Sequence, residues 1–369
     1  MKVLLLSDSA SEHTEKWALG LASNGIQIGL FSFNKARYSW YKNFSNITLL
    51  FEPDERISGS ALSEKINYLK YLKPLKQKIK EFNPDILHAH YASSYGLLAV
   101  LSRFNRVGVS VWGSDVYDFP KQNFVFKNIL KYVLAKADFI CSTSHCMAKE
   151  TSLYTSKSIT VTPFGIDVER FNRLDNQLPF ANSSEINIGN IKAIETKYGV
   201  TILIEAFAKV VKYFSNKNIQ LFLIGDGSEK DNSKQLVEKL GLKNKVIFTG
   251  RIPHADIPEW HRKLDVFVSL SVLNSESFGV SLVEAMSSQT CIVASDVEGF
   301  KEVLGTDNSC GVIVPKNSVE AASNALIQLI ENPVKSLEKS KKARLRALAH
   351  FNWKDSIQQM INVYNSNLR

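Results

Sequence analysis

The chain has 369 residues, of which 44% are hydrophobic and 22% are charged, and it carries a formal net charge of +9. These values are ordinary for a soluble globular protein of about two domains. The apolar runs are too short to span a membrane, and no signal-peptide pattern follows Met1. The four cysteines show neither metal-ligand spacing nor a secreted disulfide framework, so we expect a cytoplasmic protein.

Strand and helix patterns alternate along the first 175 residues. A helix pattern over residues 14–23 ends at Asn24-Gly25. Strands are expected at residues 3–7, 27–33, 47–51, 85–90, 107–112, 139–142 and 159–161. Strands separated by helical stretches imply parallel pairing, so we predict a Rossmann-like, doubly wound α/β domain over residues 1–175.

The densest basic stretch, residues 65–80, holds six lysines interleaved with apolar residues at helical spacing. It predicts a helix, with two readings of its charge. One is a helix packed on the sheet with an ordinary solvated face. The other is a surface that attracts anionic lipid headgroups or a polyanionic substrate. Nucleic acid is not expected as a partner, because no recognised binding module or aromatic platform accompanies the charge.

After a polar linker at residues 176–186 the alternation restarts. Strands are expected at residues 186–191, 220–224, 246–249, 266–270, 290–294 and 311–314. They predict a second Rossmann-like domain over residues 187–350, and residues 353–364 read as an amphipathic helix. Two such domains leave a cleft between the carboxyl ends of two sheets, which suits a nucleotide and a second substrate.

The first loop argues against a nicotinamide or flavin domain. Such a domain needs Gly-x-Gly-x-x-Gly between its first strand and helix. Here the loop reads Asp8-Ser-Ala-Ser-Glu-His13, without a glycine.

The most informative motif is Glu276-Ser-Phe-Gly-Val-Ser-Leu-Val-Glu284. The motif follows an apolar strand and leads into a helical pattern that begins near Leu282. Such a turn directs free backbone N–H groups and a helix dipole at its ligand, which suits a diphosphate. Glu284 could then accept hydrogen bonds from vicinal hydroxyls such as those of a ribose. Taken alone, the motif could also be a simple connection with two solvated carboxylates.

Several ordered motifs together resemble the retaining group-1 (GT4-like) glycosyltransferases of the two-Rossmann GT-B fold, over nearly the whole chain. The motif described above matches the family's Glu-x7-Glu, here Glu276 and Glu284. The further motifs that carry the resemblance are Pro84-Asp-Ile-Leu-His-Ala-His90, Val161-Thr-Pro-Phe-Gly-Ile-Asp167, Ile224-Gly-Asp-Gly-Ser-Glu229 and Val246-Ile-Phe-Thr-Gly-Arg251. In this family the last segment, residues 351–369, crosses back to the first domain.

The resemblance implies roles for the donor side. Glu284 would bind the ribose hydroxyls, and Glu276 would contact the transferred sugar as a catalytic residue. Backbone N–H groups would hold the diphosphate or sugar, and two glycine-bearing loops would lie near the nucleotide. The residues concerned are Gly279, Val280 and Ser281 for the amides, and Gly225 and Arg251 for the loops.

In the N-terminal half of the chain, His90 matches the family's active-site histidine near the donor sugar. His13 matches a position near the acceptor. An isolated histidine is more often structural, but His90 follows a strand at its carboxyl end, where ligands bind.

The sequence departs from the family pattern at two places. Where relatives carry Gly-Arg-Leu…Lys-Gly, this chain reads Gly189-Asn-Ile-Lys-Ala-Ile-Glu-Thr-Lys-Tyr-Gly199, so Asn190 takes the arginine position. Lys192 and Lys197 are the available cations, and Lys197 is the better match. A departing nucleoside diphosphate needs such cations. Where many relatives have His-Gly-x-Asp, Trp112 replaces the histidine, which leaves Asp115 as an acceptor-side candidate or a turn-forming residue.

The resulting expectation is a retaining transferase that moves a hexose or N-acetylhexosamine from a nucleotide-diphosphate sugar to a glycan hydroxyl. The acceptor is expected to be lipid-linked, in bacterial surface polysaccharide assembly, at the cytoplasmic face of the plasma membrane. No cofactor or metal is expected, because no carboxylate cluster with metal spacing is apparent. A non-catalytic scaffold and a same-fold epimerase are the alternatives.

Overall fold

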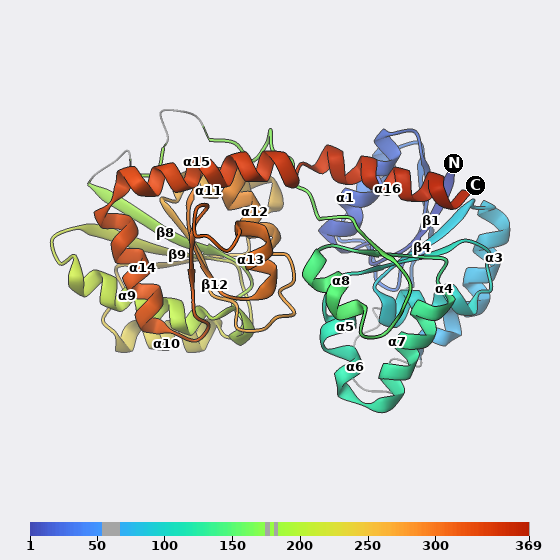
Figure 1. Ribbon diagram of the computed structural model, residues 1–369, viewed down its shortest axis with the longest axis horizontal. Helices are drawn as coiled ribbons and strands as arrows, with labels where there is room; N and C mark the ends of the chain where they lie inside the picture. Colours follow the sequence, from blue (N-terminus) through green and yellow to red (C-terminus); the bar gives the residue numbers. More distant parts are fainter. Residues whose placement is uncertain (54–66, 174–177, 181–183, 369) are drawn as a thin grey trace. The chain divides into compact units, whose positions relative to one another are not determined.

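The computed structural model describes residues 1–53, 67–173, 178–180 and 184–368. It divides into two compact units (Figure 1). Unit 1 comprises residues 1–163 and the segment from Lys354 onward, and unit 2 comprises residues 164–353. The first domain was predicted over residues 1–175, whereas the structure places residues 164–173 in unit 2. The expected linker at residues 176–186 lies partly outside the described residues.

Unit 1 is built on one parallel sheet with the strand order β3-β2-β1-β4-β5-β6-β7. Every residue of the central strands β4 and β5 is buried, because helices cover both faces. The strands are β1 (Lys2–Leu6), β2 (Gln27–Phe31), β3 (Ile47–Phe51), β4 (Ile86–His90), β5 (Val107–Val111), β6 (Phe139–Ser142) and β7 (Ile159–Val161). Each corresponds to one of the predicted strands, with ends that differ by at most about two residues.

The helices of unit 1 include several short ones that the sequence patterns did not predict, between β4 and β6. The α-helices are α1 (Glu12–Ser23), α3 (Leu72–Phe82), α4 (Leu97–Leu101), α5 (Ser114–Tyr117), α6 (Phe119–Gln122), α7 (Phe124–Lys136), α8 (His145–Thr151) and α16 (Trp353–Leu368). Single turns are the 3₁₀ helices η1 (Trp40–Asn43) and η2 (Asn67–Tyr71) and the π-helix η3 (Ala92–Gly96). The basic stretch at 65–80 is therefore not one helix. Its described part is η2 followed by α3, and residues 65 and 66 lie outside the described residues.

Unit 2 repeats the plan with six parallel strands in the order β10-β9-β8-β11-β12-β13. They are β8 (Glu185–Ile191), β9 (Asn218–Ile224), β10 (Val246–Gly250), β11 (Val266–Ser269), β12 (Cys291–Ser295) and β13 (Val312–Val314). The helices are η5 (Thr196–Tyr198), α9 (Val200–Tyr213), α10 (Lys230–Lys239), η6 (His254–Asp256), α11 (Ile257–Lys263), α12 (Val280–Ser287), α13 (Glu298–Leu304), α14 (Val319–Glu331) and α15 (Pro333–His350). Helices α9 and α14 pack against each other, as do α12 and α15 (Figure 1).

Each sheet reverses its strand order at one point, and these points position the candidate sites. The reversal lies between β1 and β4 in unit 1 and between β8 and β11 in unit 2. Ligands of open α/β sheets bind outside the carboxyl ends of the strands at such points. The loops to examine are therefore those after β1 and β4, and those after β8 and β11. No helix in the described part of the chain is long and apolar enough to cross a bilayer.

Candidate functional site

In unit 2, the strand order places Lys192 and Glu276 on neighbouring loops, after β8 and β11. The ammonium of Lys192 lies 2.8 Å from one carboxylate oxygen of Glu276 and 2.9 Å from the other. Both side chains are largely buried, with exposed fractions of 18% and 13%. Burial lowers the pKa of Lys192, but Glu276 and Tyr198 outweigh it and raise this pKa above its usual value.

Tyr198 brings the second predicted cation close to the first. The ammonium of Lys192 lies 4.7 Å from the centre of the Tyr198 ring, and that of Lys197 lies 5.0 Å from it. Such distances are those of cation–π contacts. Lys197 is exposed, whereas Lys192 contacts the glutamate. Although Lys197 matched the family pattern better, Lys192 is the cation that the structure places against Glu276.

Asn190 stands where the family pattern has arginine, but its side chain points into the sheet. Its amide nitrogen donates a hydrogen bond of 2.7 Å to the carbonyl of Val268 on β11, and the residue is buried. Asn190 therefore ties the ends of two strands together. Positive charge at this edge comes from Lys192, two residues further on.

The loop after β11 leads into α12 through Gly279, whose φ of +79° favours glycine. A Cβ atom here would lie 2.5 Å from the ring of Phe300, so a side chain is excluded on steric grounds as well. The first N–H groups of a helix have no partner within it, and in α12 these belong to Val280 and Ser281. Backbone N–H groups at the start of a helix can bind an anion.

Glu284 is buried in α12 and is held by two histidines that the sequence patterns missed. The Nε2 atom of His254 lies 3.1 Å from one carboxylate oxygen, and that of His261 lies 3.6 Å from the other. Burial raises the pKa of Glu284, but the two imidazoles outweigh burial and lower it to about 2. The carboxylate is thus ionised at neutral pH. The seven-residue spacing of the histidines, which places both near one helix face, was the available signal.

Two further predicted donor-side residues lie on the adjoining loops. Gly225 follows β9 with a φ of +146°, and its N–H donates a 3.0 Å hydrogen bond to the carbonyl of Gly250. A Cβ atom on Gly225 would lie 2.1 Å from the carbonyl oxygen of Lys192. Arg251 directly follows β10 and is exposed. Loops after four strands therefore converge around Lys192.

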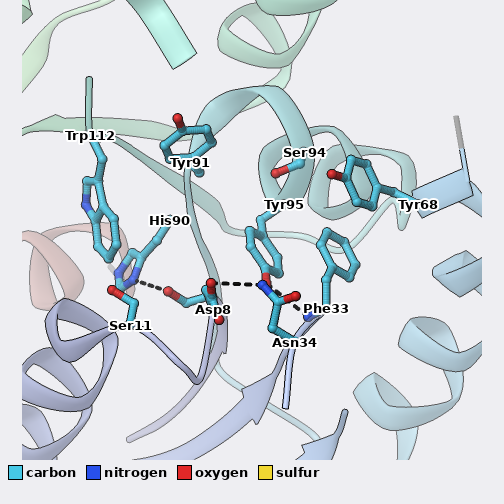
Figure 2. Close-up of a pocket in the computed structure, with 11 residues that line it drawn as sticks. Asp8, Ser11, Phe33, Asn34, Tyr68, His90, Tyr91, Ser94, Tyr95 and Trp112 are labelled. Carbon is cyan, nitrogen blue, oxygen red and sulfur yellow. Dashed lines mark hydrogen bonds between the residues drawn. The ribbon is translucent and has the colours of Figure 1, made fainter. Parts of the chain in front are cut away.

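Unit 1 has a cavity of about 280 Å³ at its own reversal point, lined by residues at or after the ends of β1, β2, β4 and β5 and by Tyr68 of η2. Figure 2 shows aromatic rings around it and polar side chains among them. The lining residues are Ser7, Asp8, Ser11, Phe33, Asn34, Tyr68, His90, Tyr91, Ser94, Tyr95 and Trp112. The ring centres of Phe33 and Tyr95 are 4.1 Å apart, and those of His90 and Trp112 are 4.5 Å apart.

His90 is fixed in this cavity by a short chain of hydroxyls. Its Nδ1 atom lies 3.0 Å from the hydroxyl of Ser7, which in turn lies 2.6 Å from the hydroxyl of Thr14. Burial lowers the pKa of His90 well below its usual value, and His88 and His13 lower it further. The ring is therefore neutral at physiological pH. His13 reaches the cavity wall indirectly, through a contact of 6.0 Å between the centres of its ring and that of Trp112.

Asp115 is fully buried and does not line the cavity. Its carboxylate accepts hydrogen bonds from the backbone N–H groups of Ala92, Trp112 and Gly113, at 2.8, 3.1 and 2.8 Å. Burial raises its pKa, although these three hydrogen bonds act in the opposite direction. Asp115 thus holds the turn at Trp112 and Gly113 and joins it to Ala92, and its role on the acceptor side stays a prediction.

Among the described residues, no group of three or more His, Cys, Asp or Glu side chains is placed to hold a metal ion. Positive charge on these loops of unit 2 comes from the side chains of Lys192, Lys197 and Arg251, and from the N-terminus of α12. An anion of the size of a diphosphate could bind there through these groups alone.

Comparisons with known proteins agree with this architecture. Residues 2–144 match the family described as Glycosyl transferase 4-like, and residues 174–346 match the family described as Glycosyl transferases group 1. A phosphatidyl-myo-inositol mannosyltransferase from Mycobacterium leprae is 31% identical over 172 residues, which are 47% of this chain and 44% of that protein. The match therefore spans less than half of that relative. An N-acetyl-alpha-D-glucosaminyl L-malate synthase from Bacillus anthracis is 26% identical over 308 residues, which are 78% of this chain and 76% of that protein.

The crystal structure of Anabaena HepE in complex with UDP is similar in fold. The TM-score is 0.80 at 18% identity, over 99% of this chain and 100% of that one. Together, the two family matches cover both parallel-sheet units. The chain belongs to the group 1, GT4-like glycosyltransferases, and its fold is GT-B.

Proposed function

We propose that this protein transfers a hexose or N-acetylhexosamine from a nucleotide-diphosphate sugar to a hydroxyl of a glycan acceptor, with retention of the anomeric configuration. The observation that carries the proposal is the buried ion pair of Lys192 and Glu276 at the strand-order reversal of unit 2. A cation and a carboxylate held together suit a reaction in which negative charge leaves and positive charge develops at the neighbouring carbon.

The donor binds unit 2 in this proposal. Glu284, ionised and fixed by its histidines, accepts hydrogen bonds from the ribose hydroxyls. The backbone N–H groups at the start of α12 hold the diphosphate together with Lys192 and Lys197. These groups supply the charge that a metal ion supplies in other transferases, so we propose that the reaction needs neither metal nor cofactor. The Anabaena protein, crystallised with UDP, supports a nucleotide ligand for this fold.

The acceptor binds the cavity of unit 1. Among the described residues that line it, Asp8 alone carries a full charge, since His90 is neutral. The Oδ1 atom of Asn34 is buried without a hydrogen-bond partner in the described part of the chain, so it is available to a ligand hydroxyl. Aromatic faces and lone acceptors suit an uncharged sugar ring rather than a phosphate or carboxylate.

The wider setting follows from the relatives. The Mycobacterium leprae relative is, by its name, a transferase to a phosphatidylinositol. We therefore propose a lipid-linked glycan acceptor, in bacterial surface polysaccharide assembly, and a place at the cytoplasmic face of an anionic membrane. The rival hypothesis of a non-catalytic scaffold relied on Asn190. It loses that support, because Lys192 contributes the positive charge at the same loop.

The deciding experiment measures release of nucleoside diphosphate from UDP-, GDP- and ADP-sugars, with and without short glycan acceptors. We expect turnover with one donor class, and loss of turnover in both Glu276→Gln and Glu284→Gln, with circular dichroism showing that each variant remains folded. Unchanged turnover in both variants would refute the site. The configuration of the product, read from the coupling constant of its anomeric proton, tests retention, and added EDTA tests independence of metal.

A further inference from the structure

Helix α7 carries large apolar side chains on its solvent-facing side as well as on its buried side. Leu130 and Val133 are completely buried in the core of unit 1. Phe124, in contrast, is 77% exposed, and Val125 is 54% exposed. Phe124 is the most exposed of the large hydrophobic residues in the described part of the chain. Single exposed apolar residues are common, but two adjacent bulky ones are more informative.

The exposed apolar residues lie together on the helix. Val125 and Tyr132 are seven residues apart, about two turns along the same side of α7, and Phe124 lies within about 100° of both around the helix axis. We refer to this surface as the outer face of α7, which comprises Phe124, Val125 and Tyr132 together with the flanking lysines Lys127, Lys131 and Lys136. The other side of the helix packs against η3 and α4 and contributes to the core, so α7 is apolar on two sides.

The charge of the outer face has one sign. Lys127, Lys131 and Lys136 are all exposed, and the helix contains no aspartate or glutamate. Lys121, on the preceding helix α6, is 2.9 Å from Glu150 and is not counted with them. Exposed aromatic residues flanked by lysines are typical of surfaces that bind anionic lipid headgroups, since the rings enter the interface and the ammonium groups meet the phosphates.

The outer face is also held firmly. The side chain of Asn123 accepts a 2.9 Å hydrogen bond from the backbone N–H of Phe126, which fixes the start of α7. The rings of Phe119 and Phe126 stack with their centres 4.5 Å apart and join α6 to α7. In Figure 1 the turn between α6 and α7 lies at the outer end of unit 1. Phe124 and Val125 are the first two residues of α7, directly after this turn, and both are exposed.

The other basic surface of unit 1, on η2 and α3, exposes less apolar area, with Leu69 at 39% as its exposed large hydrophobic residue. On η2 and α3, the exposed lysines are Lys70, Lys73, Lys76 and Lys80. The apolar residues between them face inward, since Leu75 is completely buried and both Leu72 and Ile79 pack on the core. This surface combines four exposed lysines with one partly exposed leucine, and it serves as a control for charge.

We propose that the outer face of α7 is the surface through which this protein binds an anionic lipid bilayer. The inference rests on the membrane association put forward under the proposed function, and adds to it the residues that make the contact. A lysine close to an anionic membrane raises the partition coefficient by about fivefold, so three lysines account for about 100-fold. Insertion of Phe124 and Val125 adds about tenfold or more.

The test is sedimentation of the full-length protein with vesicles of equal parts phosphatidylcholine and phosphatidylglycerol, and with phosphatidylcholine alone. The variants are Phe124→Ser/Val125→Ser, Lys127→Gln/Lys131→Gln/Lys136→Gln, and the control Lys70→Gln/Lys73→Gln/Lys76→Gln/Lys80→Gln. We expect the wild type to bind only the anionic vesicles. Both α7 variants should lose at least tenfold in partitioning, whereas the control should lose threefold or less.

Each other outcome overturns the proposal. These outcomes are absence of binding by the wild type, α7 variants that bind like the wild type, or a control that loses more than the α7 variants. Light scattering without vesicles completes the test, because dissociation of a dimer by Phe124→Ser/Val125→Ser would show that a second copy covers this face. Turnover with a soluble acceptor is measured in parallel. This turnover depends on the proposed transferase function and not on the outer face of α7. Loss of turnover would therefore count against the proposed function, and loss of vesicle binding would count against the membrane-binding surface.

Discussion

The ammonium of Lys192 and the carboxylate of Glu276 form an ion pair of 2.8 Å between the loops that follow β8 and β11. The two residues are 84 positions apart in the chain and are brought together by the reversal of strand order. Breaking a buried pair leaves one charge without compensation, which is costly. Substitution of either Lys192 or Glu276 alone should therefore destabilise this part of the protein.

The first prediction concerns Lys192. Removing its charge in Lys192→Met should lower kcat roughly 100- to 1,000-fold, because the departing diphosphate loses its nearest fixed cation. Lys192→Arg keeps the charge and should retain more activity than Lys192→Met. The measurement is steady-state release of nucleoside diphosphate. Lys197→Met is the matched control, since Lys197 is exposed and contacts the same tyrosine. A larger loss in Lys197→Met than in Lys192→Met would assign the leaving-group role to Lys197.

The second prediction concerns Glu284 and the ribose. Replacing the carboxylate in Glu284→Gln should weaken binding of the correct nucleoside diphosphate by about 10- to 100-fold, the usual contribution of hydrogen bonds to a charged group. Titration calorimetry with UDP, GDP and ADP, each beside its 2′,3′-dideoxy form, checks this. The wild type should discriminate strongly against the dideoxy form, and the variant should not. Equal discrimination by both proteins would show that Glu284 does not contact the ribose hydroxyls.

The strands could be predicted from the sequence because each one is a short apolar run between turn residues. All the strands of both sheets coincide with predicted runs, and the buried strands β4 and β5 are apolar enough to be recognised alone. The helices between β4 and β6 were not recognised. The helices α5 and α6 have only four residues each, too few for a helical period to appear, and α7 is apolar on two sides.

The partners within the site could be predicted only in part. Glu276 and Glu284 stand in one motif, but the partner of each comes from a distant loop, and spacing along the chain does not encode such contacts. Sequence matching therefore favoured Lys197, whereas the fold brings Lys192 to Glu276. His254 was missed because a lone histidine is more often structural than functional. Its hydrogen bond to Glu284 depends on how η6 is placed by α11, which packs on both η6 and α12.

The third prediction is a dependence of stability on pH that arises from His88. This imidazole is completely buried, between the hydroxyls of Tyr364 at 2.7 Å and Ser110 at 2.9 Å, and burial lowers its pKa to about 3. The unfolded chain takes up the proton near pH 6.5, but the folded chain does not. Above pH 6.5 the protonation of His88 does not reduce the free energy of unfolding. Between about pH 6.5 and 3 this free energy falls by about 1.4 kcal/mol per pH unit because of His88.

Chemical denaturation between pH 7.5 and 5 tests this dependence. The wild type should lose about 2 kcal/mol of unfolding free energy between pH 6.5 and 5 through His88. In His88→Gln the amide does not titrate, so the curve should be flatter by about that amount, although the variant is less stable throughout. The exposed residue His350 provides the control, because His350→Gln should leave the slope as it is. Parallel curves for the wild type and His88→Gln would contradict the prediction.

The last prediction concerns the backbone beneath the ion pair, at Gly225. A methyl group here would lie 2.1 Å from the carbonyl oxygen of Lys192, so Gly225→Ala must displace the loop that carries the lysine. The N–H of Gly225 also donates a hydrogen bond to the carbonyl of Gly250, which joins the loop after β9 to the end of β10. We expect turnover to fall at least tenfold, since small displacements of a catalytic group reduce rates steeply.

The matched control is Gly241→Ala. Gly241 also has a positive φ, of +69°, but a Cβ atom there would meet no atom within 4 Å. Both variants experience backbone strain of about 1 kcal/mol or more, so both should lower the melting temperature, but only Gly225→Ala should lower turnover. Equal turnover in the two variants would show that the position of the Lys192 loop does not limit the reaction.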